Sequence, residues 1–143
     1  MTTVDLTTKD YDGSWNIADH QETNRPFVIK RWIDTSVINL TNAYIYNIFT
    51  IPIGVVITGV VVTVTDAETG GSTPSIAVGD TDTNNLFEAS ADTAAPGSTV
   101  SADAAKYYSA ANELVIVADE AHNNSVFCVT VYGYSISTPA ALV

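Results

Sequence analysis

The chain contains little that could carry covalent or metal chemistry. It has one cysteine, Cys128, among 143 residues, so an internal disulfide is excluded and the fold must stand on its own core. The apolar neighbours of Cys128 indicate a small buried residue rather than a reactive thiol. The longest apolar segment, residues 51–64, has 14 residues, whereas a membrane helix needs about 20. No membrane partner is therefore expected.

Basic residues are scarce as well. The chain has 5 of them against 16 acidic residues, a formal net charge of −11. Four of the five lie within the first 31 positions, and Lys106 is the only one after Arg31. Such an acidic body would repel a phosphate backbone, so nucleic acid is excluded as a partner. The opening residues, MTTVDLTTKD, lack a basic segment followed by an apolar one, and no signal peptide is expected.

What is present is β-sheet patterning. Hydrophobic residues make up 46% of the chain and charged ones 15%, enough apolar content for the core of one domain. Apolar and polar residues alternate along residues 44–49, which predicts one face with Tyr44, Tyr46 and Ile48 and another with Ile45, Asn47 and Phe49.

Further strands are predicted in β-branched segments with the same alternation. These segments cover residues 55–65, 75–79, 113–119 and 125–137, and Gly59 predicts a bulge or bend in the first of them. Only residues 101–111, with several alanines, indicate a short helix. The pattern predicts an all-β fold, an antiparallel sandwich or barrel, and of these we expect an antiparallel β-sandwich or jelly-roll-like domain over residues 26–143.

Residues 1–25 differ from this body in composition. They are polar and have no sustained periodicity, yet Tyr11, Trp15 and Ile17 stand among them as isolated apolar points. One interpretation is a frayed terminus; the other is an extended N-terminal arm that orders against a partner, with Trp15 as its anchor. The second interpretation makes these three residues candidates for partner binding.

The stretch VGDTDTNNLFEAS, residues 78–90, resembles the first half of a calcium-binding loop. Counting Asp80 as position one, Asp82 and Asn84 occupy the next two ligand positions of an EF-hand. Position six, however, is Asn85 instead of glycine, and position twelve is Ala91 instead of glutamate. Turn chemistry, in which Asp and Asn bond their own backbone, is the stronger interpretation.

Two alternatives for the sixteen acidic residues of the chain stay open. A looser calcium site would use Asp80, Asp82 and Glu88. An accidental carboxylate pair suited to glycoside hydrolysis is the other. The remaining sequence offers no catalytic or cofactor motif: His20 and His122 each lack a second ligand at metal-binding spacing, and no nucleophile elbow or phosphate-binding loop is present. An enzyme is not expected, and neither a metal nor a cofactor is predicted.

Several motifs occur in an order typical of one family. Pro52-Ile53-Gly54 leads into a valine-rich strand that ends near a Thr-Gly-Gly turn. Val78-Gly79-Asp80, Leu86-Phe87, Tyr107-Tyr108 and Ala110-Ala111-Asn112 then follow. Over about residues 44–134 this order resembles small virion proteins of tailed bacteriophages, above all head decoration (cement) proteins. Ile53 departs from the pattern, which commonly has alanine there.

The resemblance implies a role and a set of partners. It implies a non-enzymatic virion protein, commonly a homotrimer with a β-sandwich fold, that binds the major capsid protein lattice on the capsid exterior after assembly in the host cytoplasm. Arg25, Lys30 and Arg31, near the exit of the arm, would then join Tyr11, Trp15 and Ile17 in reaching the capsid. The alternatives are a tail or fibre accessory protein, a receptor- or glycan-binding β-sandwich that uses exposed aromatic residues, and a virion enzyme that degrades cell-wall glycans.

Overall fold

The computed structural model describes residues 3–5, 25–101 and 105–136. These residues form strands, turns and loops, and no helix occurs among them. The strands are β1 (Thr3–Asp5), β2 (Arg25–Asp34), β3 (Ile45–Ile51), β4 (Val55–Asp66), β5 (Ser75–Asp80), β6 (Glu88–Asp92), β7 (Gly97–Ser101), β8 (Lys106–Tyr108), β9 (Asn112–Ala118) and β10 (Val126–Ser135).

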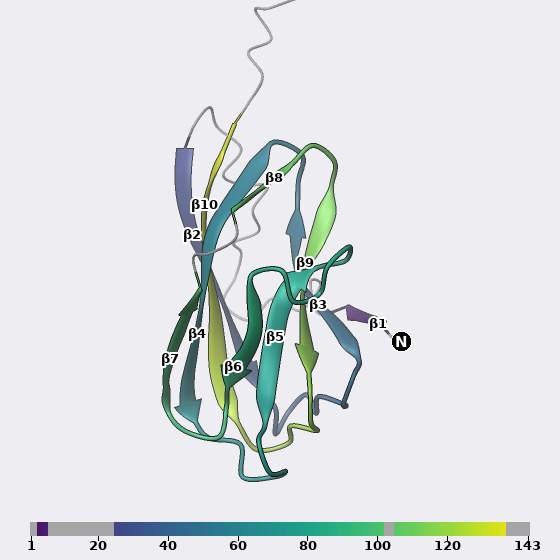
Figure 1. Cartoon of the computed structure of the whole chain (residues 1–143), viewed down its shortest axis with the longest axis vertical. Coiled ribbons are helices and arrows are strands. Elements are labelled where there is room, and N and C mark those ends of the chain that lie inside the picture. The colour runs from purple at the N-terminus through teal and green to yellow at the C-terminus, as the bar shows by residue number, and fades with distance from the viewer. Residues whose placement is uncertain (1–2, 6–24, 102–104, 137–143) are drawn as a thin grey trace, which may run out of the picture.

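The strands form two layers. The first sheet has the order β1-β3-β9-β5-β6, and the second has the order β2-β10-β4-β7, with β8 also pairing to β4. Figure 1 shows the second sheet on the left and the first on the right, packed face to face. All strand pairs are antiparallel except β1 with β3, which is parallel. The predicted all-β sandwich is confirmed.

The core lies between the sheets and follows the period-two pattern. In β10, Phe127, Val129 and Val131 are fully buried, whereas Tyr132 and Tyr134 are exposed on the opposite face. Alternating side chains of the facing strands complete the core, because successive residues of a strand point to opposite sides. Its largest fully buried members include Ile29, Ile33, Leu40, Ile48, Ile51, Ile57, Ile76, Leu114, Ile116 and Phe127.

Two of the four register shifts in the sheets bear on the predicted strands. The bulge predicted near Gly59 is present: Tyr132 pairs with Gly59 and Gly133 with Ile57, so Thr58 is the extra residue. A second bulge, in β3 between Asn47 and Phe49, was not predicted. It places Phe49 in the core on the same side as Ile48, whereas simple alternation had put Phe49 on the opposite face.

The predicted helix over residues 101–111 is wrong. Ser101 ends β7, and Lys106–Tyr108 forms β8, which pairs with Val55–Ile57 of β4. Tyr108 is 2% exposed in the core, and burying this ring while completing strand bonds outweighs the weak helix preference of the alanines. Within the described residues no helix is long and apolar enough to cross a membrane.

The predicted arm, residues 1–25, is described only at its two ends. Thr3–Asp5 forms β1 beside β3, and Arg25 pairs with Ser135 as the first residue of β2. Tyr11, Trp15 and Ile17 lie outside the described residues. The division into an arm and a body therefore stays a prediction.

Candidate functional site

Asp80 is the centre of a polar cluster at the end of β5. Its side chain points between the two sheets, and the residue is fully buried. Its Oδ1 accepts hydrogen bonds from the backbone N–H groups of Asp82, at 3.0 Å, and Thr83, at 2.8 Å. These bonds close the turn after β5, so Asp80 has the predicted turn role.

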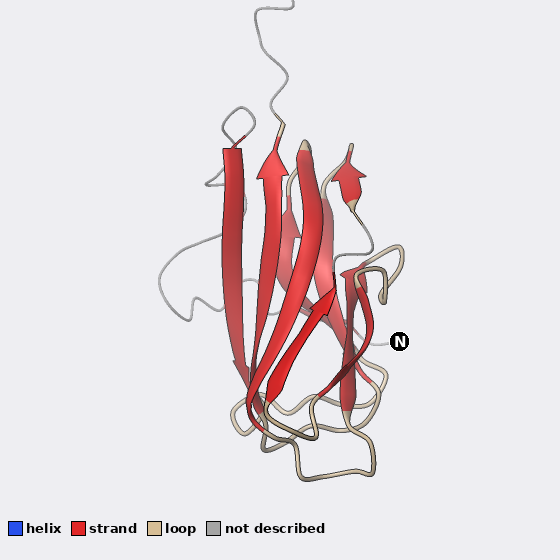
Figure 2. Cartoon of the chain, turned by 60° about the vertical axis from the view of Figure 1, so that its left-hand side comes forward, coloured by secondary structure: helices blue, strands red, loops and turns tan. Residues whose placement is uncertain are grey.

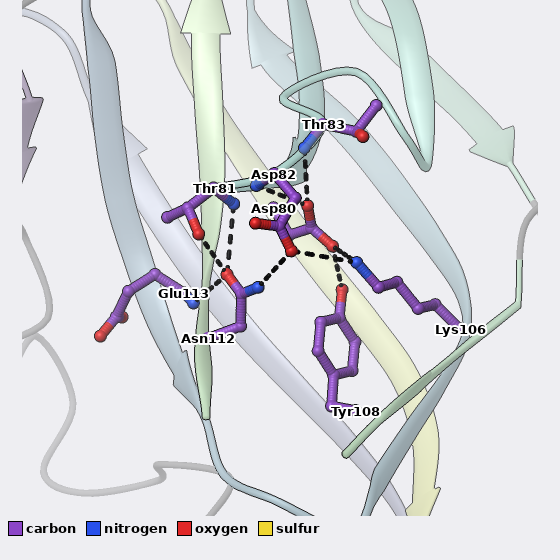
Figure 3. Close-up of polar contacts among 8 residues, drawn as sticks. All are labelled: Asp80, Thr81, Asp82, Thr83, Lys106, Tyr108, Asn112 and Glu113. Carbon is purple, nitrogen blue, oxygen red and sulfur yellow. Dashed lines mark hydrogen bonds and ion pairs between the residues drawn. The ribbon is translucent and has the colours of Figure 1, made fainter. Parts of the chain in front are cut away.

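The other carboxylate oxygen of Asp80 connects the sheets. Lys106 Nζ donates to Oδ2 at 2.6 Å, and the hydroxyl of Tyr108 donates to the same atom at 2.8 Å. Both donors come from β8 of the second sheet, whereas Asp80 ends a strand of the first (Figure 3). The carboxylate thus receives four donors, which is the condition under which a charged group can be buried without a large penalty.

Asn112 holds the loop that follows Asp80. Its side-chain oxygen accepts from the hydroxyl of Thr81 at 2.6 Å and from the backbone N–H of Glu113 at 2.7 Å. Its amide group donates to Asp82 Oδ2 at 3.1 Å, and the same oxygen lies 3.5 Å from Lys106 Nζ. The first residue of β9 therefore ties the loop after β5 back onto the first sheet (Figure 3).

Gly79 lets this loop fold close to its strand. A Cβ atom at this position would lie 2.1 Å from the carbonyl oxygen of Thr83 and 2.4 Å from the carbonyl carbon of Asn84. Both are backbone atoms, so no side-chain rotation could relieve the contact. Glycine is required here because the chain passes directly over it.

The contacts within the cluster keep Asp80 and Lys106 charged near neutral pH. Burial raises the pKa of Asp80, but hydrogen bonds from Lys106, the Thr83 backbone and Tyr108 outweigh it and leave the net pKa below its ordinary value. The hydrogen bond to Asp80 raises the pKa of Lys106. Burial, and then the same carboxylate, raise the pKa of the Tyr108 hydroxyl. Near neutral pH none of the three is poised to exchange a proton, so the arrangement is suited to holding the fold and not to acid–base catalysis.

A calcium ion would compete with this cluster for the same oxygens. Both oxygens of Asp80 already have donors, and the ammonium of Lys106 occupies the cation position. Glu88 instead accepts from the backbone N–H of Ser90 at 2.9 Å. Among the described residues, no group of three or more His, Cys, Asp or Glu side chains is placed to hold a metal ion.

We therefore predict that removing calcium leaves stability unchanged. Dialysis against a chelator, followed by thermal unfolding with and without added calcium, should give melting temperatures that agree within error. Because a ligand that binds only the folded state raises stability according to its concentration and affinity, a rise with calcium would reveal a site. An increase of several degrees on adding millimolar calcium would contradict the prediction.

His122 has a structural environment. It is fully buried; its Nε2 lies 2.7 Å from Thr93 Oγ1 and its Nδ1 lies 2.8 Å from the carbonyl oxygen of Glu120. Its backbone also pairs with that of Leu40. Both ring nitrogens are thus engaged within the protein, while His20 lies outside the described residues.

The motif residues converge on the Asp80 cluster, although they are distant in sequence. Gly79-Asp80, Tyr108 and Asn112 all belong to motifs that carry the resemblance to virion proteins. Lys106 also belongs to the Asp80 cluster, although none of the sequence motifs includes it. The signal that could have identified it is its isolation, because it is the only basic residue after Arg31 and directly precedes the two tyrosines. A single cation in a strongly acidic body is the expected partner of a buried carboxylate.

Two of the three basic residues predicted to bind a partner, Lys30 and Arg31, point to opposite sides of β2, and Arg25 is described only through its backbone pairing. Lys30 is exposed on the outer side of β2. Arg31 points the other way: it is half-buried, its Nη2 donates to the carbonyl oxygen of Ile48 at 3.3 Å, and its guanidinium lies 5.6 Å from the centre of the Phe49 ring. Partner binding by these residues stays a prediction.

Comparison with known proteins shows likeness in structure only. No protein-family model and no curated protein matches the chain. A chain in the acid-stable capsid structure of Helicobacter pylori bacteriophage KHP30 is similar with a TM-score of 0.64 and 22% identity, over 81% of this chain and 92% of that chain. What is shared is the fold.

Two further capsid structures contain similar chains. One, from the capsid of Ralstonia phage GP4, has a TM-score of 0.60 and 14% identity, over 81% of this chain and 87% of that chain. The other, from the capsid asymmetric unit of cyanophage Pam1, has a TM-score of 0.60 and 16% identity, over 91% and 99%. The similarity therefore extends over most of each chain compared.

Proposed function

We propose that this chain is a non-enzymatic structural protein of a tailed-phage virion. In this role it decorates the capsid exterior, binds the lattice of the major capsid protein and stabilises it, as a homotrimer assembled in the host cytoplasm. The observation that carries the proposal is that three structural neighbours all come from phage capsids and match over 87–99% of their own length. The resemblance of the motifs to decoration proteins supports the same role.

The polar cluster suits this role because it stabilises the fold and does not require a catalytic group. A decoration protein needs a rigid body and a binding surface, and the Asp80 cluster connects both sheets through one buried carboxylate. The direct test mixes purified protein with capsids that lack it and sediments the particles. We expect the protein to pellet with capsids and to saturate at a fixed ratio; protein that stays in the supernatant at micromolar concentration would contradict the proposal.

We further propose that the N-terminal arm attaches the body to the capsid. Trp15, with Tyr11 and Ile17, supplies apolar anchors in a polar segment, and interface hot spots favour tryptophan. Trp15→Ala is expected to weaken capsid binding by at least tenfold, because truncating such an anchor typically costs about 2 kcal/mol or more. The melting temperature of the free protein should stay the same.

A conservative variant separates anchoring from other effects. Trp15→Phe keeps an aromatic ring and should recover part of the affinity in the same sedimentation assay. If Trp15→Ala binds capsids as well as the unaltered chain does, the arm has no anchoring role. If instead it lowers the melting temperature, the tryptophan belongs to the core of the domain.

A second candidate function is glycan or receptor binding. The observation that favours it is the group of exposed aromatic side chains on the second sheet: Trp32, Tyr107, Tyr132 and Tyr134, each at least 37% exposed. Aromatic faces of this kind can stack on sugar rings. A glycan array that gives a reproducible, specific hit, together with no binding to capsids, would favour this function over decoration.

A further inference from the structure

The second sheet has an open edge at β2. This strand pairs with β10 over all ten residues, Arg25–Asp34, without a register shift. It ends the strand order of its sheet, and no strand among the described residues pairs with its other side. Figure 2 shows it as the long strand at the left border of the sheet. A long, regular strand with an unpaired side is a template for one more strand.

The other edges of the two sheets are shorter. The strands β1, β6, β7 and β8 have three to five residues each, and a register shift interrupts the pairing of β6 with β5. Short edge strands and bulges discourage the addition of a further strand. Because β2 is longer and has no bulge, it is the edge at which an additional strand is expected.

Hydrogen bonds beyond the end of β2 show which of its backbone groups are directed away from β10. The N–H of Thr35 donates to the carbonyl oxygen of Ser125 at 2.8 Å, which continues the pairing by one residue. Hydrogen-bonded pairs alternate with non-hydrogen-bonded pairs in antiparallel strands, so the odd-numbered residues of β2 bond to β10. The even-numbered residues direct their N–H and C=O groups to the open side. Asp34 agrees, since its carbonyl oxygen accepts from Val37 and Ile38 in the following turn.

The open side therefore offers a row of backbone donors and acceptors. It has the N–H and C=O groups of Val28, Lys30 and Trp32, and the C=O of Pro26. Proline has no N–H, and its position on this side removes no bond to β10. An additional strand would find three donors and four acceptors in succession.

The side chains along this edge are apolar around one cation. Val28 and Trp32 are 54% and 45% exposed, and Lys30 is exposed between them on the same side of the strand. The strand carries three of the five basic residues of the chain and one acidic residue, so it is net positive in a chain of net charge −11. It repels a second copy of β2 and attracts an acidic segment, because like charges on neighbouring strands destabilise a pair and opposite charges stabilise it.

We propose that the open side of β2 accepts an extended segment of the major capsid protein as an additional strand. This inference rests on the proposed function and names a contact that the β-sandwich itself makes with the capsid. Backbone hydrogen bonds supply affinity in such strand addition, and side chains at alternate positions supply specificity. The segment that fits has an acidic residue opposite Lys30, with apolar residues two positions before and after it, opposite Val28 and Trp32.

The arm of this chain does not contain such a segment. None of the acidic residues within positions 1–25 has apolar residues both two positions before and two positions after it. Asp19 comes nearest, with Ile17 before it and Gln21 after it. The charge and spacing along β2 therefore fit a segment of another protein better than they fit the arm.

Val28→Pro tests the strand addition. The N–H of Val28 is directed to the open side, so proline removes a donor that the added strand needs and keeps the bonds from β2 to β10. Val28→Ala is the matched control, because it shortens the side chain and keeps the N–H. In the capsid sedimentation assay Val28→Pro should bind about tenfold more weakly than Val28→Ala, because a carbonyl of the added strand loses its donor. Equal affinities of the two variants, both shown to be folded by circular dichroism, would overturn the proposal.

Lys30→Glu tests the charge and also serves if Val28→Pro does not fold. It places an acid opposite the acidic residue of the capsid segment, so capsid binding should weaken about tenfold or more, with the larger loss at low salt. Val100→Glu is the control, because Val100 is 69% exposed on β7 and both β10 and β4 lie between β7 and β2. This control should bind as the unaltered chain does. Equal losses in both variants, or no loss in Lys30→Glu, would overturn the proposal.

Hydrogen exchange separates the capsid from other occupants of the edge. In the free protein the amides of Val28, Lys30 and Trp32 should exchange faster than those of Ile29 and Ile33, which bond to β10. Capsid binding should slow the first three. If these three amides are already protected in the free protein, a segment of this chain or a second copy occupies the edge, and the proposal is overturned. Amides that stay fast in the capsid-bound chain overturn it as well.

Failure of this inference is distinguishable from failure of the proposed function. An unaltered chain that stays in the supernatant contradicts the proposed function, and the inference fails with it. If the unaltered chain and both β2 variants, Val28→Pro and Lys30→Glu, pellet equally with capsids, the chain binds through another surface. In that case only the inference is overturned.

Discussion

Replacing Asp80 with alanine is expected to lower the free energy of unfolding by about 4 kcal/mol. The substitution leaves the Tyr108 hydroxyl and the N–H groups of Asp82 and Thr83 without their acceptor, and it removes the nearer of the two ion-pair partners of Lys106. Removing one member of a buried, hydrogen-bonded charge pair typically costs about 3–5 kcal/mol. For a domain of this size we expect the melting temperature to fall by roughly 10 °C or more.

Two controls separate burial from charge in this prediction. Asp82→Asn removes an equal charge from a side chain that is 70% exposed, and it should change stability by less than about 1 kcal/mol. Asp80→Asn keeps an acceptor for the backbone N–H groups of the turn. Its loss of stability should therefore lie between that of Asp80→Ala and that of Asp82→Asn. Chemical denaturation measures all three, and a loss of under 1 kcal/mol for Asp80→Ala would contradict the structural role of the cluster.

The pH dependence gives an independent signature. The pKa of Asp80 is lowered by folding, so its contribution is present above the unfolded pKa of about 3.9 and is lost as pH falls through the lower folded value. The stability difference between the unaltered chain and Asp80→Asn should therefore be constant near neutral pH and shrink below about pH 4.

Gly79→Ala is expected to destabilise the fold by about 3 kcal/mol. The new methyl group would lie 2.1 Å from the Thr83 carbonyl oxygen, so the backbone of the loop has to move. Overpacking of this kind typically costs about 1–3 kcal/mol, and here the moving loop also strains the bonds that Asp80 makes to its N–H groups. We therefore expect Gly79→Ala to lower the free energy of unfolding by an amount at the upper end of this range.

A second glycine provides the control for this substitution. A Cβ at Gly70 would closely approach only the far end of the Glu68 side chain, its Oε1 at 3.0 Å, so Gly70→Ala should cost less than about 1 kcal/mol. Because Gly79 and Asp80 act on the same loop, the double variant should lose less than the sum of the single losses. Strict additivity, or equal effects of Gly79→Ala and Gly70→Ala, would show that the loop does not depend on close approach at Gly79.

The sandwich could be predicted because its evidence is local. Alternation in β10 places Phe127, Val129 and Val131 in the core, and a one-residue shift would expose all three, so the pattern fixes which face is buried. The turn role of Asp80 could be predicted for the same reason, since its backbone bonds reach only two and three residues along the chain.

What could not be predicted depends on contacts between distant segments. Local composition around Tyr108 favours helix, and only the pairing with β4 and the bond to Asp80 make it a strand. Phe49 enters the core because of the bulge between Asn47 and Phe49. No glycine or proline lies in this segment, so the sequence does not indicate the bulge. Arg31 lies on the inward side of β2, against Phe49, although its neighbour in sequence points to solvent.

The copy number of this chain in purified virions tests the central proposal most directly. Quantitative mass spectrometry of intact particles gives the molar ratio of the chain to the major capsid protein. A decoration protein bound across the lattice predicts a fixed ratio of the same order as the capsid protein itself, unchanged between preparations. A few copies per particle would indicate a tail or fibre component, and absence from the particles would contradict a virion role.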